Sequence, residues 1–115
     1  MSVTILHNPR CSKSRQTLQL LNDNGVSPTI VEYLKNPPSV EELTDIISKL
    51  GLPVRDVMRK KEPEYKDVDA DNQNLTDLEL LTLIHQTPKL LERPLVINGA
   101  KAAIGRPPEN VLDII

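Results

Sequence analysis

Residues 3–25 read VTILHNPRCSKSRQTLQLLNDNG and contain the clearest indication of the fold. Its first part, residues 3–7, is apolar and rich in β-branched side chains, which predicts a short buried strand that ends before Pro9. Residues 12–24 then follow a helical pattern up to Gly25, a typical residue just beyond a helix C-terminus. A strand that passes through a turn into a helix indicates the start of a βαβ unit.

The rest of that unit and a helical segment follow. Residues 29–34 are rich in β-branched side chains and predict a second strand. Two Ser/Thr-x-x-Glu capping boxes, at residues 39–42 and 76–79, each open an amphipathic helix. The polar stretch 59–74 between them has little periodicity and predicts no helix. In the second helix the apolar side chains expected to face inward are Leu78, Leu81 and Ile84.

The C-terminal part predicts a hairpin and a last helix. Asn98-Gly99 separates the apolar runs 95–97 and 100–104, which is a strong hairpin signal, and residues 107–115 follow a helical pattern. Strand–helix–strand, a mostly helical middle, hairpin and helix form the order of a thioredoxin-like α/β fold, βαβ then ββα. We therefore expect a single domain over residues 1–115 with an α-helical insertion at about residues 39–91.

Composition excludes several classes of function. The formal charge of −2 provides no basic field for nucleic acid, and with Tyr33 and Tyr65 as the only aromatic residues there is no stacking platform for bases. No apolar run approaches the roughly 18–20 residues of a membrane span, and the N-terminus does not resemble a signal peptide. One Cys and two scattered His make no metal site. We expect a monomeric cytoplasmic protein without nucleic-acid or membrane partners.

The single cysteine, Cys11, is the candidate nucleophile. It lies in the turn before the first helix, where unpaired amide groups and the helix dipole favour an anion, and Arg10, Lys13 and Arg15 add positive charge. These effects favour the thiolate and predict a pKa below the free-thiol value of about 8.5. The alternative is a small buried hydrophobic residue, for which a turn of basic and hydroxyl residues is a poor place.

Ser14 stands where a dithiol C-x-x-C motif has its second cysteine. With one thiol the chain cannot resolve its own oxidised intermediate, so an outside thiol such as glutathione or a glutaredoxin must do so.

Four motifs carry a family resemblance: HNPRCSKSR at residues 7–15, MRKK at 58–61 followed by Tyr65, RPLVI at 93–97 and GRPPE at 105–109. In order and spacing they resemble the glutaredoxin-dependent arsenate reductase family over essentially the whole chain. The best-known members have Gly-Thr after the cysteine, so the Cys-Ser-Lys-Ser loop of this chain looks like that of a sister branch.

The resemblance implies a thioredoxin-like fold with a helical insert, no bound cofactor, glutathione as cosubstrate, glutaredoxin as partner and a small oxyanion as substrate. It places the nucleophile on Cys11, the histidine near the thiol on His7, the residues of the helix start on Ser14 and Arg15, and the oxyanion-binding arginines on Arg59, Arg93 and Arg106.

Several of these assignments have a plain structural alternative. Arg59 could be a solvated charge beside neighbouring lysines, and His7 could be a strand-end histidine bonded for structural reasons. Arg93 and Arg106 each precede a proline, which restricts the backbone there and favours a functional role. The fold resemblance also predicts a cis bond between Arg93 and Pro94, facing the thiol.

Three functions remain open from the sequence. The first is glutathione- and glutaredoxin-dependent reduction of arsenate to arsenite through the Cys11 thiolate and the arginine site. The second is a monothiol oxidoreductase that acts on another thiol or on mixed disulfides. The third is a non-catalytic regulator with the same fold.

Overall fold

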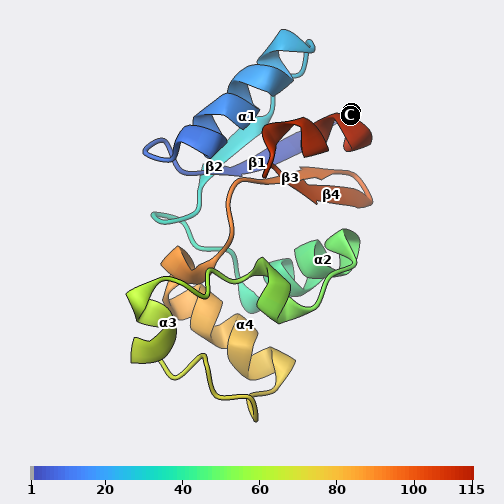
Figure 1. The fold of residues 1–115 in the computed structure, drawn as a ribbon. Coiled ribbons are helices and arrows are strands. Elements are labelled where there is room, and N and C mark those ends of the chain that lie inside the picture. The colour runs from blue at the N-terminus through green and yellow to red at the C-terminus, as the bar shows by residue number, and fades with distance from the viewer. Residues whose placement is uncertain (1) are drawn as a thin grey trace. The chain divides into compact units, whose positions relative to one another are not determined.

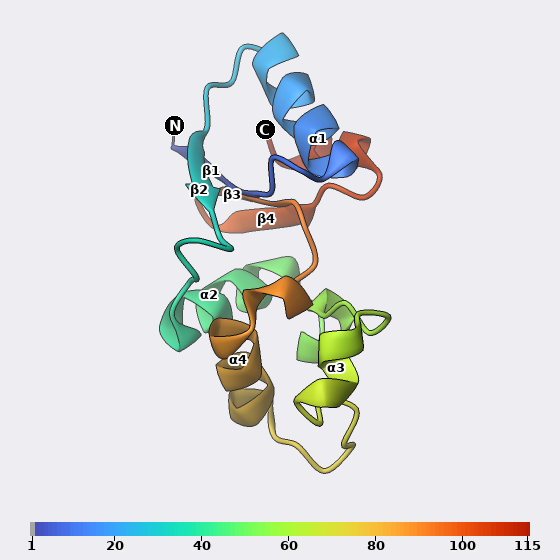
Figure 2. The same cartoon turned by 90° about the vertical axis from the view of Figure 1, so that its left-hand side faces the viewer.

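The computed structural model describes residues 2–115. Contacts between residues divide the chain into two compact units, of which the first combines Met1–Asn36 with Arg93–Ile115 and the second is Pro37–Glu92. The first unit therefore contains both ends of the sequence, and the second contains the residues predicted as a helical insertion. Figures 1 and 2 show the two units from two directions.

A mixed four-stranded sheet forms the base of the first unit, with strand order β2-β1-β3-β4. The strands are β1 (Val3–His7), β2 (Thr29–Glu32), β3 (Leu95–Asn98) and β4 (Lys101–Ile104). β1 and β2 are parallel and joined through α1 (Ser12–Asp23), whereas β3 is antiparallel to both β1 and β4. This is the predicted thioredoxin-like arrangement of βαβ followed by ββα.

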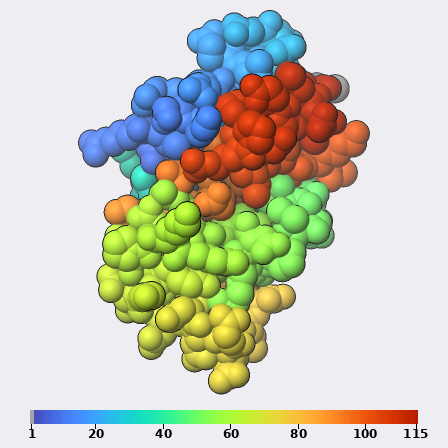
Figure 3. Space-filling model, viewed as in Figure 1, coloured from blue at the N-terminus to red at the C-terminus, as the bar shows by residue number. Residues whose placement is uncertain are grey.

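One face of this sheet is covered by α1 and the C-terminal η3 (Pro108–Ile114), which also pack against each other (Figure 1). Figure 3 shows the red atoms of the C-terminal segment beside the blue atoms of α1. The core between the two layers is aliphatic, since its fully or almost fully buried side chains are Val3, Ile5, Leu21, Val96 and Val111. Burial of such side chains stabilises the unit by about 1.5–3 kcal/mol each.

The hairpin turn lies one residue later than predicted. Asn98 pairs with Lys101 across the strands, so the two loop residues are Gly99 and Ala100. Gly99 adopts φ +61°, which the first position of a two-residue hairpin loop commonly requires. The last helix also differs from the expectation, since η3 is a 3-10 helix, which is wound more tightly than an α-helix. Leu112 in this helix is 39% exposed.

The regular elements of the second unit are the helices α2 (Val40–Leu50), η1 (Val54–Val57), α3 (Pro63–Asp67), α4 (Asp77–Gln86) and η2 (Pro88–Leu90). Both predicted capping boxes are present, Ser39 with Glu42 and Thr76 with Glu79. In the part of the chain that the structure describes, no helix combines the length and apolar character needed to cross a bilayer.

The inward face of α4 differs from the prediction. Leu80, Leu81 and Ile84 are buried, whereas Leu78 is 64% exposed. At 3.6 residues per turn, Leu78 lies roughly 200° around the helix from Leu80, so the two cannot both face the core. The spacing of three residues between Leu78 and Leu81 was misleading, because Leu80 with Ile84 takes the inward position.

The short helix α3 was not predicted, and a single side chain fixes the segment around it. Arg55 Nη1 donates to the Tyr65 hydroxyl and to the carbonyl of Ala70, each at 2.7 Å, and its Nη2 donates to the carbonyl of Asn72 at 2.6 Å. Tyr65 and Ala70 are buried. A polar segment without periodicity is thus held in part by one guanidinium from outside it.

Candidate active site

The turn between β1 and α1 places Cys11 directly before the helix. Cys11 has extended backbone angles and precedes the first helical residue, Ser12. Its amide donates to the carbonyl of Asn8 at 3.0 Å, and its own carbonyl accepts from the amide of Arg15 at 3.0 Å. The side-chain oxygen of Asn8 also accepts from the amide of Arg10 at 3.0 Å. Cys11 therefore lies at the N-terminus of α1, where the first amide groups have no hydrogen-bond partner within the helix.

The Cys11 thiol is held with a pKa below its ordinary value. Burial alone raises the pKa, since only 9% of Cys11 is exposed, but hydrogen bonds from the amides of Ser14 and Lys13 lower it. Arg93 lowers it further, both by its charge and by a hydrogen bond from its side chain. The sulfur is buried among donors rather than among hydrocarbon, so the thiolate is still favoured.

Arg93 joins the site from far along the sequence because β3, which it precedes, pairs with β1. The bond between Arg93 and Pro94 is cis, as predicted. Nε and Nη1 of Arg93 are buried and have no hydrogen-bond partner within the described residues. A charged group with buried, unpaired donors beside a thiolate is suited to receive an anion.

His7 and Ser14 form a buried pair under the turn. His7 Nδ1 lies 2.6 Å from Ser14 Oγ, and the same oxygen accepts from the amide of Asn8 at 3.0 Å. Burial lowers the pKa of His7, an effect that Glu32 opposes and Arg15 reinforces, so the imidazole is favoured in its neutral form. Ser14 is fully buried. It therefore connects the end of β1 to the first turn of α1, while its amide bonds the Cys11 sulfur.

Arg15 and Arg106 are placed differently. Arg15 is exposed, and its Nη1 donates to the carbonyl of Pro9 at 2.8 Å, which braces the turn before Cys11. Arg106 is also exposed and precedes a second cis bond, to Pro107. No hydrogen bond or ion pair within residues 2–115 holds its guanidinium, which leaves that group available to a ligand.

Sequence reasoning missed a close contact behind the cysteine, between Gly105, Pro94 and Thr17. The Gly105 amide donates to the carbonyl of Pro94 at 2.9 Å, and Thr17 is fully buried on α1. A Cβ at position 105 would lie 2.5 Å from Thr17 Oγ1 and 2.8 Å from Pro94 Cγ. A larger residue here would force Thr17 or Pro94 to shift, and the GRPPE motif was the one signal in the sequence that marked the position.

Comparison with known proteins gives a consistent result. The family model described as "ArsC family" matches residues 6–114. An arsenate reductase of Haemophilus influenzae is 53% identical, in an alignment that covers 100% of this chain and 100% of its own. One of Neisseria meningitidis serogroup B is 50% identical over 95% of this chain and 94% of its own. An arsenate reductase structure from Vibrio cholerae superposes with a TM-score of 0.98 at 48% identity, covering 100% of this chain and 98% of that one.

The chain belongs to the ArsC family. Among the residues that the resemblance assigns, the first unit of this ArsC chain brings together Cys11, His7, Ser14 and Arg93 through hydrogen bonds or charge. The structure of the second unit places Arg59 among carboxylates, with its Nη2 2.7 Å from Glu62 Oε1 and its Nε 3.9 Å from Glu92 Oε1. Arg59 is thus not a free surface charge, contrary to the plain alternative.

Proposed function

We propose that this ArsC-family chain reduces arsenate to arsenite with Cys11 as the nucleophile. The observation that supports this best is the position of Cys11, where two helical amides and Arg93 lower the pKa of a buried thiol. Only the thiolate is a strong nucleophile, and a site that stabilises one anion beside unpaired guanidinium donors is also suited to hold a second.

Arginine forks supply the oxyanion site in this proposal. Arg93 offers two buried donors beside the thiol, and the family resemblance adds Arg106 as a further ligand. Guanidinium groups suit arsenate because they stay charged and present paired donors to tetrahedral oxygens. His7 and Ser14 act as positioning residues, since they fix the turn that carries Cys11.

The reaction begins when the Cys11 thiolate attacks arsenic. A sulfur–arsenic bond forms, and an arsenic–oxygen bond breaks with release of water or hydroxide. Glutathione then attacks the adduct, and glutaredoxin completes the reduction to arsenite. Over the cycle arsenic gains two electrons, two thiols lose them by forming one disulfide, and one arsenate oxygen leaves as water.

Glutathione and glutaredoxin enter because the chain has one cysteine and Ser14 in place of a resolving thiol. A single thiol cannot close the cycle, so the second must come from outside. We expect the reaction to take place in the reducing cytoplasm, where both the lone thiol and glutathione stay reduced.

A coupled assay with NADPH, glutathione, glutathione reductase and glutaredoxin tests this function. We expect arsenate-dependent NADPH oxidation by the wild-type protein and none by Cys11→Ser. A separate alkylation test establishes that Cys11 of the wild-type protein is reactive. If unmodified protein that passes this test gives no arsenate turnover, arsenate is rejected as the substrate. Turnover of a glutathionylated model protein in the same tube would then favour a monothiol oxidoreductase.

A further inference from the structure

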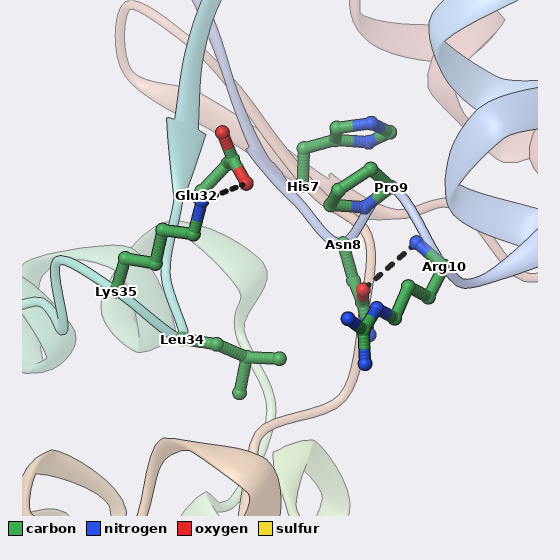
Figure 4. A pocket seen from close by; sticks show the side chains of 7 residues that line it. All are labelled: His7, Asn8, Pro9, Arg10, Glu32, Leu34 and Lys35. Atoms are coloured by element: carbon green, nitrogen blue, oxygen red, sulfur yellow. Dashed lines mark hydrogen bonds and ion pairs between the residues drawn. The ribbon is translucent and has the colours of Figure 1, made fainter.

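A cavity of about 370 Å³ opens beside the turn that carries Cys11 (Figure 4). It lies where β1 and β2 end side by side, and its wall includes the three residues that directly precede the cysteine in sequence, 8–10. The volume is at the small end of the range for ligand pockets. The full lining is His7, Asn8, Pro9, Arg10, Glu32, Leu34 and Lys35.

Charges of both signs line this cavity. Arg10 is exposed, and no hydrogen bond or ion pair to its guanidinium occurs among the described residues. Lys35 and Glu32 form only a long ion pair of 3.6 Å, with side chains 75% and 41% exposed (Figure 4). A weak, solvated pair of this kind adds little stability and is easily opened by a ligand. Leu34, 44% exposed, adds an apolar surface between the charges.

This mixture does not suit arsenate. Glu32 would repel a dianion, and no buried, unpaired guanidinium donor of the kind that Arg93 offers belongs to the lining. It suits a small zwitterion, whose ammonium group pairs with Glu32 while its carboxylates pair with Arg10 and Lys35. Such a ligand replaces the long ion pair with contacts to both partners at once.

We propose that this cavity binds the peptide thiol that attacks the Cys11 adduct, a molecule of the γ-glutamyl-cysteinyl-glycine type. The proposal rests on the function proposed above and assigns a place to its second substrate. Such a tripeptide carries one ammonium group and two carboxylates around a central thiol, and fully extended it spans about 10 Å. Arg10 lines the cavity and directly precedes Cys11, so a ligand that pairs with Arg10 binds at the turn that carries the nucleophile.

Titration with S-methylglutathione, monitored by amide NMR of the full chain, tests the assignment because this analogue binds without reacting. We expect saturable shifts at residues 8–10 and 32–35. Arg10→Ala and Lys35→Ala should each raise the Kd about tenfold, the loss expected for a charge-assisted hydrogen bond. Lys101→Ala is the matched control, since Lys101 is an exposed lysine on β4, the opposite edge of the same sheet.

The outcomes separate the cavity from the reaction. Shifts confined to residues 93–97, or no saturable shift, overturn the assignment. The same is true if the KM for glutathione in the arsenate assay is unchanged in both variants, even though arsenate reduction itself is then confirmed. Saturable binding at the cavity without arsenate turnover supports the thiol site and rejects arsenate. Dispersed spectra of the variants verify that each one folds.

Discussion

Nδ1 of His7 lies 2.6 Å from Oγ of Ser14, and this buried hydrogen bond connects the last residue of β1 to the first turn of α1. The same hydroxyl accepts from the amide of Asn8. Because Cys11 lies between these residues, the bond fixes both ends of the turn that carries the nucleophile. His7 is favoured as a neutral base here, so the link needs no proton uptake at neutral pH.

Ser14→Ala should destabilise the fold while leaving the thiol activated. The substitution leaves His7 Nδ1 and the Asn8 amide without their partner in a buried place, which costs about 1–3 kcal/mol. The amide of residue 14 remains, so the pKa of Cys11 should stay below that of a free thiol. Urea denaturation measures the first effect and pH-dependent alkylation the second, with Ser12→Ala at an exposed position as control. Unchanged stability would contradict the structural role of the hydroxyl.

Arg93→Ala should raise the pKa of Cys11, because a positive charge and a hydrogen bond to the sulfur are both lost. At neutral pH a smaller fraction of the thiol is then ionised, so iodoacetamide reacts more slowly than with wild type, and the two rates converge at high pH. The KM for arsenate should rise roughly tenfold or more, as for the loss of a hydrogen bond to a charged group. Arg93→Lys restores charge without the fork and should recover only part of both effects. Identical profiles for wild type and Arg93→Ala would remove Arg93 from the site.

Gly105→Ala should destabilise the first unit by about 1–3 kcal/mol through overpacking against Thr17 and Pro94. A double-mutant cycle with Thr17→Ala isolates this cause, since removal of Oγ1 and Cγ2 opens most of the space that the new methyl group needs. The stability loss from Gly105→Ala should be smaller in the Thr17→Ala background. Additive losses in thermal unfolding would show that crowding is not the reason for glycine at this position.

Arg55→Ala should destabilise the second unit by about 2 kcal/mol, because the hydroxyl of Tyr65 and the carbonyls of Ala70 and Asn72 lose a charged donor. In this variant, amide hydrogen exchange at residues 65–72 should accelerate relative to wild type by more than it does elsewhere in the unit. Lys66→Ala, at an exposed position in the same segment, serves as the control. Uniform exchange rates in Arg55→Ala would contradict the assignment of this segment's order to one side chain.

Local signals predicted most of the fold. The capping boxes at Ser39 and Thr76 start helices where they were expected, because each is a short-range pattern of hydrogen bonds. Elements fixed by distant groups were harder to predict. Residues 63–67 form a helix in a stretch that Arg55 bonds from outside. The hairpin was missed by one residue for a local reason, because the two-residue loop places Gly99 at φ +61°.

In the site, too, the local features could be predicted from the sequence and the distant contact could not. Cys11 could be identified from its place before a helix, and the lowered pKa follows in part from local amides. Sequence reasoning assigned the nearby charge to Arg10, Lys13 and Arg15, whereas the largest charge effect comes from Arg93, which only the pairing of β3 with β1 brings to the thiol. No local pattern contains that information, and the family motif supplied it instead.

The pH dependence of Cys11 alkylation, in folded and in urea-unfolded protein, shows whether the fold holds this thiol as a thiolate. Cys11 is the only thiol in the chain, so the rate reports this residue alone. We expect the folded protein to keep reacting as the pH falls well below the point at which the unfolded chain has lost its thiolate. A folded-state midpoint at or above that of the unfolded chain would show that the amides of Lys13 and Ser14 and the charge of Arg93 do not hold a thiolate, and would contradict the account.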